Sequence, residues 1–404
     1  MRREGDRRVA AKEEEMMCFK DMYVKETARR KKLHNTIMEM KGNIRVFCRV
    51  RPILEMERTK AGAGQSVDVM SYPIDDEIIV KQDEAGLLSK RFEFDKVFQP
   101  ASTQEEVFTE VEPLVTSAMD GYNVCIFAYG QTGSGKTFTM EGPEDNRGVN
   151  FRTLGALFAL AAARAADYSF EFTVSMLEIY NETVRDLLST DSKKSLDIRQ
   201  MPGGGVFVQN LVKEPVASLT DVTTAMTAGY KNRAVGSHNV NEHSSRSHLV
   251  LSVEVRSTGV IDGRVSRGKL HLIDLAGSER VGKTDATGDR LKEAQNINRS
   301  LSALGDVVNA LAKKGGHVPF RNSKLTYLLQ DSLGGDSKVL MFVNCSPVLW
   351  NAPETMCSLN FATRCRKVEL GSAKKTSDSA EVARLRRMVE SLGGSAGGGG
   401  SRRK

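Results

Sequence analysis

Short apolar runs alternate with helical patterns through the middle of the chain. The runs that are rich in β-branched and aromatic residues predict strands, at 44–50, 124–129, 172–180, 249–255, 270–275 and 339–344. Between them, apolar residues recur with the period of an amphipathic helix at 103–118, 221–231 and 291–313. Strands that alternate with helices favour an α/β layered domain with a central, mostly parallel sheet flanked by helices.

A different pattern covers residues 1–43. Steps of three and four residues from Met16 to Met40 meet an apolar or aromatic side chain at six of eight positions, with Glu26 and Arg30 as exceptions. No proline interrupts this segment, and Gly42 supplies a helix stop. The pattern predicts a long helix with an imperfect heptad seam that can pair with a second chain as a coiled coil. A single solvated helix fits the pattern equally well.

The chain changes character again after residue 370. Residues 379–392 have the pattern of a basic amphipathic helix, and six glycines fall within 393–400 before the basic end at 402–404. The composition predicts a helix followed by a flexible, glycine-rich, basic tail. Such a helix could bind a regulator such as a calmodulin-like protein, add a contact to another partner, or simply be solvated.

Charge is distributed unevenly along the 404 residues, which carry a net charge of +7. Residues 1–41 carry +4 and residues 371–404 carry +5, so the body between them is close to neutral at −2. A basic balance permits an anionic partner such as nucleic acid, anionic lipid or an acidic protein surface, without saying which.

Targeting and cysteine patterns narrow the class of protein. No run of 18 apolar residues occurs, and the charged N-terminus lacks an apolar core, so neither a membrane span nor a secretory signal is expected. The six cysteines are widely spaced and form no CxxC pair. We therefore expect a soluble, intracellular protein with reduced thiols and no zinc or disulfide framework.

The strongest motif lies directly after the apolar run 124–129. The sequence GQTGSGKT fits the phosphate-binding pattern GxxxxGK[ST], in the strand-loop-helix context that the pattern requires. Its backbone N–H groups would cradle phosphates, Lys136 would reach the β- and γ-phosphates, and Thr137 would offer a hydroxyl to Mg²⁺. The predicted nucleotide-binding residues here are Gly130, Gln131, Thr132, Gly133, Ser134, Gly135, Lys136 and Thr137.

Two further segments supply what nucleotide hydrolysis needs besides a cradle. Asp274 follows an apolar strand and could hold Mg²⁺ through water, with the N–H of Gly277 facing the γ-phosphate. Residues 241–248, NEHSSRSH, are dense in hydroxyl and amide groups. Each segment alone is a weak signal, but together with the cradle they indicate a nucleoside triphosphatase. The histidines at 238, 243 and 248 lack partner ligands for a metal, which favours a structural role for all three.

These motifs resemble those of kinesin motor domains. GQTGSGKT, NEHSSRSH and DLAGSER are similar to the P-loop, switch I and switch II of that family, and RVRP at 49–52 resembles its RxRP adenine-binding element. The resemblance covers roughly residues 44–370 and implies a P-loop NTPase-type layered domain that uses ATP and Mg²⁺. No NKxD guanine motif is found in the sequence, which also favours ATP over GTP.

The resemblance assigns roles to individual residues. Arg49, Arg51 and Pro52 would flank the adenine, near Phe138. In the catalytic group, Ser245 would touch Mg²⁺ and the γ-phosphate, Asn241 and Ser244 would help hold the attacking water, and Arg246 and Glu279 would form the salt bridge that closes the two switches. Glu279 would then relay the proton of the water. The predicted catalytic residues are Asn241, Ser244, Ser245, Arg246, Asp274, Gly277 and Glu279.

A basic stripe follows switch II in the sequence. Residues 280–324 carry +5, which leaves the rest of the body near −7. A basic stripe on an acidic body produces oriented attraction to an acidic surface. The stripe and the segment HVPFRNSKLT resemble the part of kinesins that grips the microtubule, whereas nucleic acid is disfavoured by the lack of interleaved aromatic residues. The predicted microtubule-binding residues are Arg280, Lys283, Arg290, Lys292, Arg299, Lys313, Lys314, Arg321 and Lys324.

The order of segments points to one branch of the family. The helix at 1–43 runs straight into the first strand, which resembles the neck of the C-terminal-motor, minus-end-directed kinesins, the fourteenth family. The resemblance implies a motor domain at 44–370, a neck mimic or regulatory helix at 371–392 and a tail at 393–404. It also implies a microtubule-stimulated ATPase of the cytoplasmic cytoskeleton, spindle included, that forms homodimers or heterodimers through its neck. A non-motile microtubule crosslinker with the same fold is the alternative.

Overall fold

The computed structural model describes residues 2–61, 67–82, 88–191, 196–201, 205–235, 244–280, 289–313, 316–335, 337–368, 373 and 376–377. Its central feature is a ten-stranded mixed sheet with the order β11-β7-β12-β13-β6-β14-β1-β5, to which β8 and β15 are added at the sides. The strands from β13 to β5 pair in parallel, and β12, β7 and β11 pair antiparallel. The predicted α/β class with a P-loop NTPase-like sheet is confirmed.

The elements have the following bounds. The strands of the main sheet are β1 (Ile44–Val50), β5 (Lys96–Phe98), β6 (Asn123–Tyr129), β7 (Tyr168–Tyr180), β8 (Thr183–Asp186), β11 (Glu214–Val216), β12 (Ser247–Gly259), β13 (Val265–Asp274), β14 (Ser337–Cys345) and β15 (Thr376–Ser377). Two small sheets contain β2 (Met70–Ser71), β3 (Glu77–Lys81) and β4 (Ser89–Glu93), and β9 (Ile198–Gln200) and β10 (Val206–Val208). The helices are α1 (Arg2–Met40), α2 (Glu55–Ala61), α3 (Gln104–Met119), α4 (Lys136–Met140), α5 (Val149–Ala163), α6 (Leu219–Val235), α8 (Asp289–Ala312), α9 (Lys324–Leu328), α10 (Gln330–Leu333) and α11 (Ala352–Arg366), with short 3-10 turns at η2 (Phe320–Asn322) and η3 (Leu349–Asn351).

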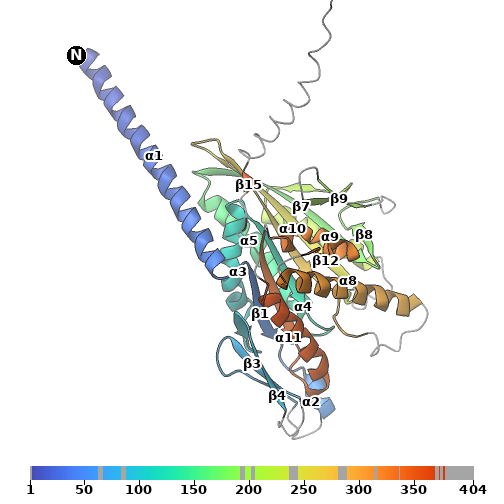
Figure 1. Ribbon diagram of the computed structural model, residues 1–404. Helices are drawn as coiled ribbons and strands as arrows, with labels where there is room; N and C mark the ends of the chain where they lie inside the picture. The colour runs from blue at the N-terminus through green and yellow to red at the C-terminus, as the bar shows by residue number, and fades with distance from the viewer. Residues whose placement is uncertain are drawn as a thin grey trace, which may run out of the picture.

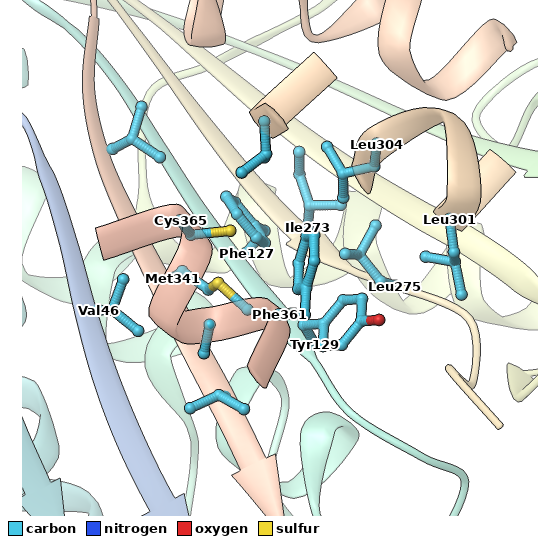
Figure 2. Close-up of a cluster of buried hydrophobic side chains, with 14 of the residues drawn as sticks. Val46, Phe127, Tyr129, Ile273, Leu275, Leu301, Leu304, Met341, Phe361 and Cys365 are labelled. Atoms are coloured by element: carbon cyan, nitrogen blue, oxygen red, sulfur yellow. The ribbon is translucent and has the colours of Figure 1, made fainter. Parts of the chain in front are cut away.

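Helices cover both faces of the main sheet because its inner strands are buried on both sides. Alternate residues of β6 enter different cores: Cys125 and Phe127 pack with α8, α9 and α11, and Val124 and Ile126 pack with α3, α5 and α6. Figure 2 shows part of the first core, in which side chains of β6, β13, α8 and α11 meet. The strands and helices predicted between residues 44 and 344 are all present in this layered arrangement (Figure 1).

The predicted long helix at the N-terminus is α1, which projects from the body (Figure 1). The helix ends at Met40, and Gly42, with a φ of +98° and an N–H bond to the carbonyl oxygen of Glu39, provides the expected stop. The seam side chains are solvent-exposed, among them Phe19 and Ile37. Pairing of this seam with a second chain remains a prediction.

Other sequence expectations can be compared directly with the structure. All six cysteines are free thiols, and four of them are buried. Within the described ranges, no group of side chains forms a metal cluster, and no helix is long and apolar enough to span a membrane. The predicted basic helix and tail after residue 377 lie outside the described residues.

Candidate active site

The phosphate-binding loop connects the end of β6 to the start of α4. Gly130, Gly133 and Gly135 have φ values of +150°, +75° and +96°, in the region that favours glycine. At Gly130, an added Cβ would lie 2.3 Å from the carbonyl oxygen of Asn344, so only glycine fits between the loop and β14. The predicted loop is therefore formed, and its curvature depends on these glycines.

Lys136 and Thr137 stand at the first turn of α4. The Nζ of Lys136 donates to the carbonyl oxygens of Gly130 and Gln131, each at 2.9 Å, and burial lowers the pKa of this ammonium. The hydroxyl of Thr137 donates to Oδ2 of Asp274 at 2.7 Å. This contact joins the phosphate-binding loop to the end of β13, as the sequence motifs require.

The environment of Asp274 fits a divalent cation. The residue is 5% exposed, its Oδ1 atom has no hydrogen-bond partner among the described residues, and burial raises its pKa. A hard cation such as Mg²⁺ takes oxygen ligands and would offset the cost of burying this carboxylate. Ser134 Oγ is likewise buried and has no hydrogen-bond partner among the described residues. These oxygens and the glycine cradle fit a magnesium–triphosphate group.

The turn after Asp274 is held through four successive backbone N–H groups. Residues 275, 276, 277 and 278 donate, in order, to Ala128 O, His248 Nδ1, Ser245 O and Gly130 O, at 3.3, 3.0, 2.8 and 3.1 Å. These bonds connect the turn to β6, to Ser245 and His248 near the start of β12, and to the phosphate-binding loop. The N–H of Gly277 is donated to Ser245 O in this conformation, and its contact with the γ-phosphate stays a prediction.

The expected salt bridge between Arg246 and Glu279 is also not formed. Arg246 Nη1 pairs with Glu293 Oε2 of α8 at 2.7 Å. Glu279 instead accepts from the backbone N and the Oγ1 of Thr132, at 2.8 and 2.6 Å. Its carboxylate folds back over Gly277, where an added Cβ would lie 2.3 Å from Oε2. Each member of the expected pair therefore has another partner in this conformation.

The two arginines of the RxRP element bond to different neighbours, Arg51 to the phosphate-binding loop and Arg49 to the helices beside it. Arg49 is 6% exposed and donates to Gln104 Oε1 and Thr139 Oγ1, at 2.8 and 3.1 Å, and burial lowers its pKa to about 10. Arg51 donates from Nε to the carbonyl oxygen of Gly133 at 2.6 Å and forms an ion pair with Glu57. Both side chains are engaged with protein groups in this conformation, and their place beside the adenine stays a prediction.

The aromatic and proline neighbours of this element remain accessible. Pro52 is exposed, and the ring of Phe138 is 44% exposed with the Arg49 guanidinium 5.2 Å from its centroid. An exposed ring beside the loop provides a stacking surface for a flat base.

Switch I is only partly described. Asn241 lies outside the described residues, whereas Ser244, Ser245 and Arg246 are half-buried. Sequence reasoning missed Arg233 of α6, which donates to Ser247 Oγ at 2.9 Å and lies 3.7 Å from Glu178. An arginine at the end of a helix just before a serine-rich loop was the available signal. Its role is to hold the end of the loop at the start of β12.

The basic stripe is partly described as well. Arg280, Arg299, Lys313 and Arg321 are exposed and Lys324 is half-buried, and they lie on segments that pack together, from the end of the Asp274 turn through α8, η2 and α9. Lys283 and Lys314 lie outside the described residues, as do the side chains of Arg290 and Lys292. That these residues form one microtubule-binding surface stays a prediction.

A second polar junction, missed by sequence reasoning, docks the base of α1. Asp120 is 2% exposed and pairs with Arg164 at 3.0 Å and Lys31 at 3.5 Å. Next to it, Lys338 Nζ donates to Asn35 Oδ1 at 2.7 Å, and burial lowers the pKa of Lys338 to about 8. No motif indicated these contacts, because their members come from four separate segments of the chain.

Comparison with known proteins gives consistent matches. The family model for the kinesin motor domain matches residues 49–368. The chain is 55% identical over 368 residues to kinesin-like protein KIN-14E of Oryza sativa subsp. japonica, and 53% identical over 378 residues to KIN-14R of Arabidopsis thaliana. These alignments cover 91% and 92% of the chain but 34% of each relative, so the chain spans about a third of their length.

Solved structures match over most of the chain. One is described as the C-terminal motor and motor homology domain of Kar3Vik1 fused to a synthetic heterodimeric coiled coil, with a TM-score of 0.78 and 39% identity over 89% of this chain and 94% of that one. Another, described as a fast kinesin, has a TM-score of 0.76 and 39% identity over 83% and 94% of the two chains.

Proposed function

The chain belongs to the kinesin motor family, and from that premise we propose that it is an ATP-driven microtubule motor. The proposal is supported above all by the bond between Thr137 and Asp274, which joins the phosphate-binding loop to the turn after β13. The other carboxylate oxygen of Asp274 has no hydrogen-bond partner among the described residues. The reaction is hydrolysis of the β–γ phosphoanhydride bond of ATP, stimulated by microtubules.

Different residues of the chain would bind the phosphates, Mg²⁺ and the base of the nucleotide. The loop N–H groups and Lys136 bind the phosphates, with Lys136 exchanging its two carbonyl partners for phosphate oxygens. Thr137 and Ser245 would hold Mg²⁺ directly and Asp274 through water, and the ion would neutralise charge that develops on the β- and γ-phosphate oxygens. Phe138 and Pro52 offer the accessible surface for the base.

Hydrolysis needs a water held in line with the γ-phosphorus. We assign the positioning of this water to Asn241 and Ser244. Glu279 accepts the proton that the water loses. The water oxygen bonds to the γ-phosphorus, the bond to the bridging oxygen breaks, and ADP and phosphate leave. For this step Glu279 must release Thr132 and Arg246 must release Glu293, so that the two can pair across the switches. The Gly277 N–H must likewise release Ser245 O to reach a phosphate.

Direction is proposed from the position of the neck. Helix α1 leads directly into β1, and its base is held on the motor by Asn35 and Lys338. A lever at this end, in a chain whose relatives are KIN-14 proteins, supports minus-end-directed movement. The exposed seam of α1 supports a homodimer or heterodimer through a coiled coil, and the basic stripe supports association with the microtubule cytoskeleton.

Gliding of polarity-marked microtubules over surface-bound protein tests the proposal. We expect ATP-dependent gliding with the plus ends leading, together with ATPase activity that rises with microtubule concentration. Microtubule binding without stimulated turnover would instead identify the non-motile crosslinker. The presence of Lys136, Thr137, Ser245, Asp274 and Glu279 in one chain favours the motor.

A further inference from the structure

A buried histidine connects the turn after Asp274 to helix α8. His248 is the second residue of β12, and both it and Ser300 of α8 are 2% exposed. The backbone N–H of Ala276 donates to His248 Nδ1 at 3.0 Å, and His248 Nε2 lies 2.7 Å from Ser300 Oγ. One imidazole ring therefore spans the space between a turn of the nucleotide site and a helix of the basic stripe.

The chemistry of the partners fixes the direction of each bond. A backbone N–H can only donate, so Nδ1 accepts and the neutral ring carries its hydrogen on Nε2. This hydrogen is donated to Ser300 Oγ, whose own hydroxyl donates to the carbonyl oxygen of Ile297 at 2.7 Å. Burial, with Arg233 and Lys136 nearby, lowers the pKa of His248 to about 3, so the ring stays neutral. The hydrogens of the Ala276 N–H, the His248 Nε2–H and the Ser300 hydroxyl therefore each have one acceptor.

Other contacts also hold α8 beside the nucleotide site. Arg246, two residues before His248, pairs with Glu293 of α8 at 2.7 Å. In Figure 2, Leu275 of the turn lies near Leu301 and Leu304 of α8, and all three belong to one buried core. Helix α8 thus packs on the turn through apolar contacts. The hydrogen bonds from Ala276 through His248 to Ser300 add a connection with fixed geometry within this packing.

We propose that His248 is a positioning residue that couples the place of the 274–277 turn to the place of α8. A buried N–H or ring nitrogen that loses its partner costs the full desolvation penalty, so a shift of the turn favours a matching shift of the ring and of Ser300. Close packing leaves little room for the ring to relax independently. The inference rests on the proposed function only in that α8, with Arg299 next to Ser300, faces the microtubule.

Hydrogen exchange of the α8 amides tests the coupling without microtubules. The protein is compared with ADP and with a non-hydrolysable ATP analogue, as the unaltered chain and as Ser300→Ala. We expect α8 protection in the unaltered chain to differ between the nucleotides, and this difference to shrink at least fivefold in Ser300→Ala. The matched control is Ser252→Ala, which removes another buried serine–histidine bond, Ser252 Oγ to His271 Nδ1 at 2.7 Å, away from the turn.

Three results would overturn the inference: no nucleotide-dependent difference in α8 of the unaltered chain, the same difference in Ser300→Ala, or an equal loss in the Ser252→Ala control. If Ser300→Ala does not fold, His248→Gln replaces it, because glutamine retains a donor near Ser300 and loses the acceptor for Ala276.

Turnover measurements separate this inference from the proposed function. In Ser300→Ala we expect basal ATPase within about twofold of the unaltered chain, and stimulation by microtubules reduced at least fivefold. An equal fall of basal and stimulated rates would indicate a merely structural role and contradict the inference. If the unaltered chain shows no stimulation, the motor proposal fails, and the exchange experiment alone decides the role of His248.

Discussion

At the scale of single residues, the groups with the chemistry of hydrolysis are bound to one another. Lys136 is held by loop carbonyls, Thr137 by Asp274, and Glu279 by Thr132. Each of these bonds satisfies a buried or half-buried polar atom that a nucleotide, Mg²⁺ or a closed switch would satisfy in another way. The proposed hydrolysis would therefore require an exchange of partners rather than the approach of free side chains.

Asp274→Asn tests the role of the buried carboxylate. Asparagine keeps the shape and the acceptor for Thr137 but removes the negative charge that favours a divalent cation. We expect the maximal ATPase rate to fall about a hundredfold or more, because an electrostatic group at the reaction centre is lost. The measurement is ATPase activity at saturating ATP and microtubules, with Asp75→Asn, an exposed carboxylate far along the chain, as the control. A rate within threefold of the unaltered chain would contradict the assigned role.

The lowered pKa of His248 predicts a pH dependence of stability. The folded pKa is about 3, below the ordinary value of 6.5, so between these pH values the unfolded chain binds a proton that the folded chain does not. The free energy of unfolding therefore falls as the pH drops below 6.5, by about 2 kcal/mol from this residue by pH 5. Urea unfolding of the unaltered chain and of His248→Asn, at pH 7.5 and at pH 5, measures the free energy of unfolding of each protein. The stability difference between the two proteins should narrow at pH 5, and an unchanged difference would refute the prediction.

At the scale of elements, the buried contacts of α1 with the motor lie near the base of the helix, and the exposed hydroxyl of Tyr23 adds one bond to Asp167 at 2.6 Å. The seam of the helix is exposed over most of its length, whereas Met38 and Asn35 are 3% and 2% exposed. Asn35, Lys338 and the cluster around Asp120 form the polar part of this attachment. The orientation of the neck therefore depends on a few buried polar contacts rather than on a broad apolar interface.

Asn35→Ala should loosen the neck. It removes the acceptor of Lys338 and leaves a buried ammonium group without that bond, at a cost of about 1–3 kcal/mol. We expect faster hydrogen exchange at residues 31–41 and slower gliding, with basal ATPase unchanged. The matched control is Asn360→Ala, because Asn360 Oδ1 accepts a bond from Lys90 at 2.7 Å on an exposed part of the surface. Equal effects of the two substitutions would argue against a special role for the neck junction.

At the scale of the whole molecule, the net charge of +7 conceals a separation of basic ends and a basic stripe from an acidic remainder. The exposed members Arg299, Lys313 and Arg321 lie on elements that pack beside the nucleotide site. Attraction to an acidic filament at this side would place the partner next to the helix that contacts the switches.

Replacing both Arg299 and Lys313 with alanine tests the stripe. We expect the microtubule concentration for half-maximal ATPase to rise about three- to tenfold at low salt, because exposed charges act mainly on association, and the effect should shrink at higher salt. The basal rate should not change. A control, Arg264→Ala, removes a side chain that is 80% exposed on the hairpin between β12 and β13. A similar weakening by the control would show that only net charge matters.

Sequence patterns predicted the main sheet because its strands are long, apolar and bounded by turns, and they predicted the phosphate-binding loop because glycine spacing encodes its curvature. They did not predict the β2–β3–β4 sheet, whose strands are short and only partly buried. They assigned Arg49 and Arg51 to the nucleotide, which stays a prediction, and did not predict that both are bound by neighbouring protein groups.

The sequence by itself determined the fold class, the loop that cradles phosphate, the long neck helix and the residue types available for hydrolysis, since each depends on local spacing. Only the tertiary structure decided the partners: Glu293 for Arg246, Thr132 for Glu279, Lys338 for Asn35 and Ser300 for His248. These pairs join segments that are 47 to 303 residues apart. Which polar group pairs with a buried partner depends on the distance between them and on the cost of desolvation. Both depend on the tertiary structure, so no local sequence pattern encodes them.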